Sequence, residues 1–118
     1  MSGIHGKRIL VLEDDVLLAL DAADALEAGG AIVLGPVHRV SAALALLEKE
    51  HPDAALLDVN IAGTTSADVA KRLADAGVPF VLATGYGGLS GIEGSGAVVD
   101  KPYTHQQLNA ALAGVLSA

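Results

Sequence analysis

Residues 8–15 read RILVLEDD, a short apolar run that is followed at once by three acidic residues. An apolar run without polar alternation is typical of a strand that is covered on both faces, as strands of parallel sheets are. Asp15 can cap a helix that follows, which leaves Glu13 and Asp14 between the strand and the helix. The stretch therefore predicts a βα unit with acidic groups at the carboxyl end of its strand, where open α/β sheets place their ligands.

The same alternation of short apolar runs and segments of helical period continues along the chain. We expect strands at 8–12, 31–34, 54–57, 79–83 and 97–99. Helices are expected from Asp15 to Gly29, from Ser41 to Glu50, from about Ser66 to Ala76, and from Thr104 onward. Strands and helices in alternation imply parallel pairing with right-handed crossovers, and so a doubly wound α/β sheet.

Three local features refine this expectation. Gly35-Pro36 is predicted to be a turn that follows the second strand. Residues 85–96 hold six glycines, and each disfavours a helix by roughly 1 kcal/mol relative to alanine, so a fourth helix is expected to be reduced or irregular. In the first helix, acidic residues recur at every third position, so its apolar residues should lie largely on the opposite side. Those residues are Leu17, Leu18, Leu20, Ala22, Ala25 and Leu26.

The composition fits one domain and excludes several classes of function. With 118 residues, 52% of them hydrophobic, the chain is predicted to be a single domain over 1–118 without an output domain. A net charge of −7 opposes binding to nucleic acid or to an anionic membrane surface. The chain has no cysteine, which removes disulfides and thiol chemistry, and its start does not resemble a signal peptide. We therefore expect a cytoplasmic protein.

Polar residues at the ends of the predicted strands point to one site. Glu13 and Asp14 follow the first strand, Asp58 ends the third, Thr84 ends the fourth and Lys101 follows the fifth. In the strand order 2-1-3-4-5 the first and third strands are neighbours, so their carboxylates converge. Clustered carboxylates without cysteine favour Mg²⁺, or Mn²⁺, and such an ion attracts phosphate oxygens. With a hydroxyl and an ammonium nearby, the group predicts a phosphoryl-transfer site with a carboxylate nucleophile.

These residues, in this order and at these strand ends, resemble the receiver domain of bacterial two-component response regulators. The resemblance covers nearly the whole chain, from RILVLEDD through LLDVN and ATGY to DKPY and the last helix. It implies a flavodoxin-like, doubly wound (βα)5 three-layer sandwich with the parallel sheet order 2-1-3-4-5.

The resemblance also implies a role for each site residue. Asp58 is then the phosphoacceptor, and Glu13 and Asp14 are the acidic pair that binds the metal. Thr84 is the switch hydroxyl, and Lys101 is the lysine that contacts the phosphoryl group. Asn60 would contribute its backbone carbonyl to the metal, and the peptide between Lys101 and Pro102 would be cis.

The segment PFVLATGYG (79–87) resembles the PFxFATG-type signature of a receiver subgroup common in alphaproteobacteria, many of them single-domain regulators in stress-response phosphorelays. Leu82 stands where that signature has its second phenylalanine. Val98 stands three residues before the lysine, where receivers usually carry the aromatic residue that rotates on activation. Tyr86 and Tyr103 are equally well interpreted as partner contacts or as ordinary rim aromatics. The histidines lack metal-ligand spacing and are expected to be surface residues: His5, His38, His51 and His105.

The leading hypothesis is a phosphorylation-dependent signalling switch. It would take a phosphoryl group from a sensor histidine kinase or a histidine phosphotransfer protein, catalyse only its own phosphorylation and dephosphorylation, and signal to a partner that the sequence does not identify. An alternative is a small Mg²⁺-dependent aspartyl-phosphate phosphatase or phosphotransferase, which would need a second acid near its nucleophile. Asn60 stands two residues after Asp58, where haloacid-dehalogenase-type phosphatases place that acid. A third hypothesis is the receiver segment of a hybrid kinase.

Overall fold

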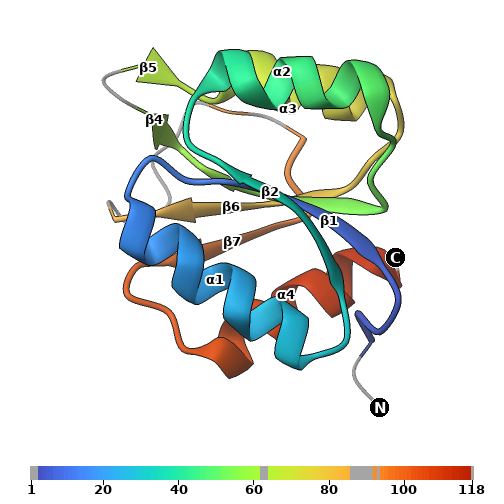
Figure 1. The fold of residues 1–118 in the computed structure, drawn as a ribbon, viewed down its shortest axis with the longest axis vertical. Coiled ribbons are helices and arrows are strands. Elements are labelled where there is room, and N and C mark those ends of the chain that lie inside the picture. Colours follow the sequence, from blue (N-terminus) through green and yellow to red (C-terminus); the bar gives the residue numbers. More distant parts are fainter. Residues whose placement is uncertain (1–2, 62–63, 86–91, 93, 118) are drawn as a thin grey trace.

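In the part of the chain that the computed structural model describes, residues 3–61, 64–85, 92 and 94–117, five parallel strands form one sheet (Figure 1). They are β1 (Arg8–Leu12), β2 (Ile32–Val37), β3 (Ala54–Asp58), β6 (Phe80–Thr84) and β7 (Ala97–Asp100). Their spatial order is β2-β1-β3-β6-β7, which confirms the predicted order 2-1-3-4-5 and places β1 beside β3.

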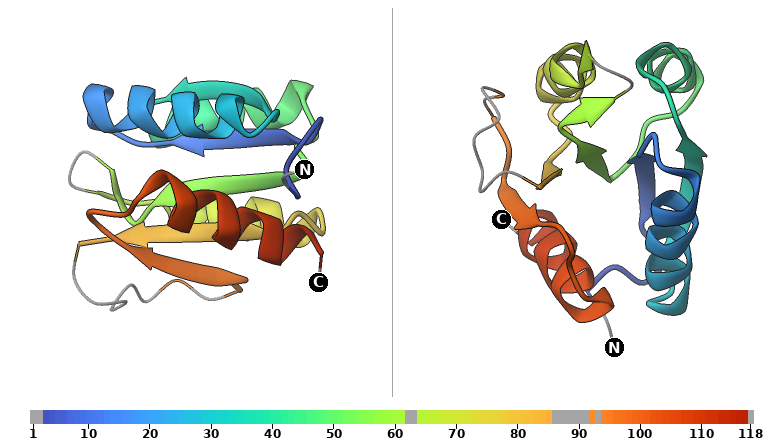
Figure 2. Two further views of the ribbon diagram at one scale, coloured as in Figure 1. Left: turned by 90° about the horizontal axis from the view of Figure 1, so that it is seen from below. Right: turned by 90° about the vertical axis from the view of Figure 1, so that its left-hand side faces the viewer.

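Helices cover both faces of this sheet (Figure 2). One face carries α1 (Val16–Ala28) and α4 (His105–Leu116), and the other carries α2 (Val40–Lys49) and α3 (Ala67–Asp75). Asp15 caps α1 by accepting hydrogen bonds from the backbone N–H groups of Leu17 and Leu18, at 3.0 and 3.1 Å. Thr104 caps α4 in a reciprocal capping box with Gln107. The predicted three-layer sandwich and both predicted caps are confirmed.

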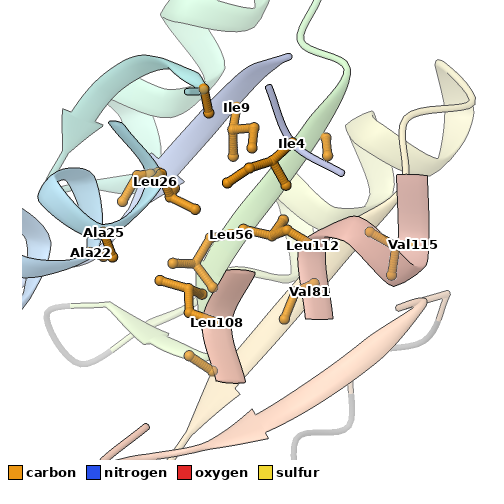
Figure 3. Close-up of a cluster of buried hydrophobic side chains, with 14 residues drawn as sticks. Ile4, Ile9, Ala22, Ala25, Leu26, Leu56, Val81, Leu108, Leu112 and Val115 are labelled. Atoms are coloured by element: carbon orange, nitrogen blue, oxygen red, sulfur yellow. The ribbon is translucent and has the colours of Figure 1, made fainter. Parts of the chain in front are cut away.

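The core lies in two layers, one on each face of the sheet, because successive strand residues point to opposite faces. Ile9 and Val11 belong to the layer under α1 and α4, whereas Leu10 and Leu12 belong to the layer under α2 and α3. The helices complete the first layer with Ala22, Ala25, Leu26, Leu108, Leu112 and Val115 (Figure 3). Packing on both faces holds the strands in place and so fixes the residues at their carboxyl ends.

The prediction that the apolar residues of α1 lie on one side, opposite its acidic residues, holds for Ala22, Ala25 and Leu26 but is wrong for three leucines. Leu17, Leu18 and Leu20 are 78%, 42% and 51% exposed. The helix contacts the sheet through Ala19, Ala22, Ala23, Ala25 and Leu26, which follow the i, i+3, i+4, i+7 spacing of one helix face. Together with Val16, which is 54% exposed, the three leucines form an exposed group that we call the α1 apolar surface (Val16, Leu17, Leu18 and Leu20).

The prediction of a turn at Gly35-Pro36 is also wrong, because β2 continues through these residues to Val37. Leu10 pairs with Leu34 and Leu12 pairs with Val37, so β2 has one more residue than β1 between the two pairs. This extra residue is a β-bulge. Gly35 has a φ of +100°, and a Cβ there would lie 2.6 Å from the backbone nitrogen of Val37. The bulge therefore requires glycine at this position.

One further segment differs from the sequence prediction, and another lies outside the residues that the structure describes. A short hairpin, β4 (Asn60–Ile61) paired with β5 (Thr64–Thr65), lies between β3 and α3, where neither strand was predicted. The reduced fourth helix falls largely on residues 86–91 and 93, outside the described residues, and stays a prediction. Among the helices that the structure describes, none is long and apolar enough to cross a membrane.

Candidate functional site

The carboxyl ends of β1 and β3 bring three carboxylates together. Glu13 and Asp14 follow β1, and Asp58 is the last residue of β3. Leu12 pairs with Leu57, so the chain that leaves β1 passes beside Asp58. One oxygen from each of the three carboxylates lies within 4.8 Å of the other two. Glu13 and Asp58 are buried, at 3% and 6% exposure, whereas Asp14 is exposed.

Lys101 reaches the same carboxylates from β7. Its backbone N–H donates to the carbonyl of Thr84 at 2.8 Å, which ties the end of β7 to the end of β6. Its Nζ donates to Oε1 of Glu13 at 2.7 Å and lies 3.1 Å from Oδ2 of Asp58. The peptide between Lys101 and Pro102 is cis, as the family resemblance implied. One ammonium therefore bridges carboxylates that come from two different strands.

Burial and crowding change the ionisation of this group. Burial, followed by a hydrogen bond with Asp58, raises the pKa of Glu13 from 4.5 to about 7, against the opposing effect of Lys101. Burial by itself lowers the pKa of Lys101, but the hydrogen bonds to Glu13 and Asp58 outweigh it and raise that pKa above 10.5. Near neutral pH, Lys101 is therefore charged and Glu13 is partly protonated.

A pocket of about 370 Å³ gives access to Asp58. Thr84 ends β6 next to Asp58, because Ala83 pairs with Asp58, and the Thr84 side chain is buried. The pocket is lined by Asp14, Asp58, Val59, Asn60, Thr84, Gly85 and Lys101. A ligand in this pocket would meet a carboxylate, a hydroxyl and an ammonium on its walls.

The β4-β5 hairpin determines the direction of the backbone carbonyl of Asn60. The N–H of Ser66 donates to the carbonyl of Val59 at 3.0 Å, and Asn60 lies opposite Thr65. In an antiparallel pair, hydrogen-bonded and non-hydrogen-bonded residue pairs alternate, so Asn60 and Thr65 do not exchange backbone hydrogen bonds. The Asn60 carbonyl is therefore directed away from Thr65, and Asn60 is one of the residues that line the pocket.

The donor set fits a hard divalent cation. Among the described residues, the groups close to Asp58 that could bind a metal are the carboxylate oxygens of Glu13, Asp14 and Asp58 and the carbonyl of Asn60. Sites made only of oxygen favour Mg²⁺ or Mn²⁺. Three carboxylates face a single ammonium, so the group can stay negatively charged beside Lys101. The acidic group is thus suited to hold such an ion next to Asp58.

Val98 and Tyr103, which the sequence also singled out, are not among the residues that line this pocket. Val98 is 45% exposed on the edge strand β7. Tyr103 is half-buried against the core layer of α1 and α4, and burial, followed by the charge on Glu13, raises the pKa of its phenol. Tyr86 lies outside the described residues, so its role stays a prediction.

Sequence reasoning missed one residue beside the site. His38 was expected on the surface, but it is half-buried at the end of β2, and its Nδ1 lies 2.9 Å from the backbone oxygen of Glu13. The expectation is confirmed for His5, His51 and His105, which are exposed. The spacing of the histidines carries no signal for the His38 contact, because that contact depends on the bulge in β2.

A second hollow adjoins the pocket through Lys101. It runs between α1 and the start of α4 and is lined by Leu18, Asp21, Lys101, Pro102 and Tyr103. Leu18, which also belongs to the α1 apolar surface, lines this hollow with Pro102 and Tyr103.

Comparison with known proteins identifies structures of the same architecture. No family model matches this chain, and no curated protein matches it. The solution structure of SdrG from Sphingomonas melonis Fr1 is 38% identical, covering 98% of this chain and 99% of that chain, with a TM-score of 0.79. A response regulator receiver protein from Sinorhizobium medicae WSM419 is 26% identical, covering 96% of each chain, with a TM-score of 0.83.

The response regulator PhyR from Brucella abortus is 28% identical, with a TM-score of 0.84. The match covers 95% of this chain but 48% of PhyR, so this chain spans about half the length of that protein. The three likenesses cover 95%, 96% and 98% of this chain. The chain therefore belongs to the receiver-domain family of response regulators.

Proposed function

We propose that this chain, as one receiver domain over 1–118, is a phosphorylation-dependent switch that accepts a phosphoryl group on Asp58 from a phosphohistidine. The observation that carries this proposal is the contact between Asp58 and the Lys101 ammonium at the wall of an open pocket. A carboxylate that is buried on one side and open to a ligand on the other suits nucleophilic attack. The nearby ammonium suits the anionic group that is transferred.

The proposed transfer exchanges one bond to phosphorus for another. A carboxylate oxygen of Asp58 forms a bond to phosphorus while the N–P bond of the donor breaks, and the electron pair of that bond returns to the imidazole nitrogen. Lys101 and the hydroxyl of Thr84 are placed to stabilise the oxygens of the transferred group. The chain later hydrolyses its own phosphoaspartate, so it acts on itself and not on a separate substrate.

The acidic group has a defined role in this scheme. Glu13, Asp14, Asp58 and the backbone carbonyl of Asn60 would hold Mg²⁺, or Mn²⁺. The ion supplies positive charge between the anionic nucleophile and the anionic phosphoryl group. These residues lie at the ends of β1 and β3 and in β4 of the short hairpin that follows β3.

The phosphohistidine belongs, in this proposal, to a sensor histidine kinase or a histidine phosphotransfer protein in the cytoplasm. Such a protein must bring its imidazole to the pocket that contains Asp58, and we propose that it docks on the α1 apolar surface. Leu18 of this surface lines the hollow that shares Lys101 with the pocket. Its exposed leucines offer the apolar contact area that stable docking needs. Val98 and Tyr103 are candidate contacts for the downstream partner.

The proposal is tested by the intact mass of the chain after incubation with Mg²⁺ and acetyl phosphate or phosphoramidate. We expect the mass of one added phosphoryl group, which is lost in Asp58→Asn and when EDTA removes the metal. Asp68→Asn is the matched control, because Asp68 is an exposed aspartate on α3, and it should be labelled like the unmodified chain. Labelling that persists in Asp58→Asn would contradict the proposal.

A further inference from the structure

The backbone of Glu13 is held on both sides by the end of β2. Its N–H donates to the carbonyl of Val37 at 3.0 Å, and its carbonyl lies 2.9 Å from Nδ1 of His38. A carbonyl oxygen can only accept, so Nδ1 of His38 carries the hydrogen and donates it. Val37 and His38, which are consecutive at the end of β2, therefore hold both the backbone N–H and the backbone carbonyl of Glu13.

The bulge in β2 creates this arrangement. Because Leu12 pairs with Val37, the next residues along the two chains are Glu13 and His38. Without the extra residue, Leu12 would pair with Pro36, and Val37 would stand beside Glu13. Valine has no side-chain donor for the Glu13 carbonyl. Gly35, which the bulge requires, thus brings an imidazole to the acidic pair.

The hydrogen bond acts on the peptide that joins the two acids. The carbonyl of Glu13 and the N–H of Asp14 belong to one planar peptide unit, so a donor that fixes the carbonyl also fixes the direction in which the chain enters Asp14. The side chain of Glu13 is held separately, because Oε1 accepts from Lys101 and Oε2 accepts from the N–H of Asp15 at 3.1 Å. Asp14 follows that peptide directly, so the direction of the peptide affects where the Asp14 carboxylate lies.

We propose that His38 is a positioning residue for the cation site. By donating from Nδ1 to the carbonyl of Glu13, it fixes the peptide between Glu13 and Asp14 and holds their carboxylates in the arrangement that the ion needs. This inference rests on the proposed function, because the ion is part of that proposal. It adds a residue that contacts neither the pocket nor a carboxylate oxygen.

The first test is Mg²⁺ titration followed by amide chemical shifts, with no phosphodonor present. His38→Leu removes the donor, and we expect Mg²⁺ to bind about tenfold more weakly, at the lower end of the range for loss of a group that orients metal ligands. His38→Asn keeps an N–H donor at a similar distance from the backbone, and its affinity should return to within about threefold of the unmodified chain. His51→Leu, at an exposed histidine, should leave the affinity unchanged.

The second test needs no variant and so does not depend on whether His38→Leu folds. The ¹⁵N shifts of the neutral His38 ring, recorded at alkaline pH, should report hydrogen on Nδ1 and not on Nε2. Hydrogen on Nε2 would overturn the proposal, as would equal Mg²⁺ affinity in His38→Leu and the unmodified chain. Failure of the unmodified chain to bind Mg²⁺ at all would instead contradict the proposed function, while the Nδ1 hydrogen bond would still stand.

Discussion

The pKa of Glu13 makes the affinity for Mg²⁺ depend on pH near neutrality. Burial and the nearby Asp58 raise this pKa to about 7 in the metal-free chain. A carboxylate binds a cation in its ionised form, so the ion competes with a proton for Glu13. We therefore expect Mg²⁺ to bind more tightly as the pH rises through the pKa of Glu13.

The size of the effect follows from the ionised fraction of Glu13. With a pKa of about 7, roughly a tenth of the chains carry an ionised Glu13 at about pH 6, and roughly nine-tenths do at about pH 8. The Kd for Mg²⁺ should therefore be about tenfold lower at the higher pH. A glutamate with its ordinary pKa of 4.5 would be ionised at both values and would leave the Kd almost unchanged.

Calorimetric titration with Mg²⁺ in two buffers of different ionisation enthalpy measures both the Kd and the protons released. Close to one proton should leave per ion bound at about pH 6, and close to none at about pH 8. Glu13→Gln is the control: it should bind more weakly but lose the dependence on pH. A Kd that is equal at the two pH values in the unmodified chain would refute the reasoning, because Glu13 would then be ionised throughout.

Three further predictions concern the core, the docking surface and the lysine. Leu26→Ala should lower the free energy of unfolding by about 2–5 kcal/mol, whereas Leu17→Ala, at the exposed face of the same helix, should change it by about 0.5 kcal/mol or less, as measured by urea unfolding. Leu17→Glu should slow phosphoryl transfer from the cognate phosphohistidine protein but not from acetyl phosphate; equal slowing with both donors would mean that the α1 apolar surface is not a docking site. Lys101→Ala should slow labelling of Asp58 by acetyl phosphate by roughly a hundredfold, the typical effect of losing one donor that stabilises transition-state charge. Lys71→Ala, at an exposed lysine on α3, should not slow labelling, and an unchanged rate in Lys101→Ala would exclude a role for that ammonium in the transfer.

The sheet and the carboxylate group could be predicted because each depends on short-range signals that agree with one another. The apolar runs are bounded by acids, glycines or prolines, and every strand is followed by a capped or polar segment. Once the strand order is assumed, neighbouring strand ends bring Glu13, Asp14 and Asp58 together without any knowledge of side-chain conformation. Lys101 is brought to the same edge in the same way, because it follows β7, which lies beside β6.

The buried face of α1 could not be predicted from the acidic spacing, for a physical reason. Leucine is more hydrophobic than alanine, so a prediction based on hydrophobicity places the buried face of the helix on the side of the leucines. Close packing against the sheet favours small residues instead, and Ala19, Ala22 and Ala23 allow the helix to approach β1 and β2. Leu17 and Leu20 are then exposed, and exposed apolar area can serve contact with a partner.

The contact between His38 and Glu13 shows where sequence reasoning must stop, because it depends on the register of two parallel strands. A shift of one residue decides whether Val37 or His38 stands beside Glu13, and that shift comes from the bulge at Gly35-Pro36. The same dipeptide reads equally well as a turn, since both structures use glycine at positive φ. Because the Gly35-Pro36 dipeptide fits either a turn or a bulge, it does not determine which side chain reaches the neighbouring strand. A group on an adjacent strand that orients the ligands of a site can therefore be identified only once the register of the two strands is known.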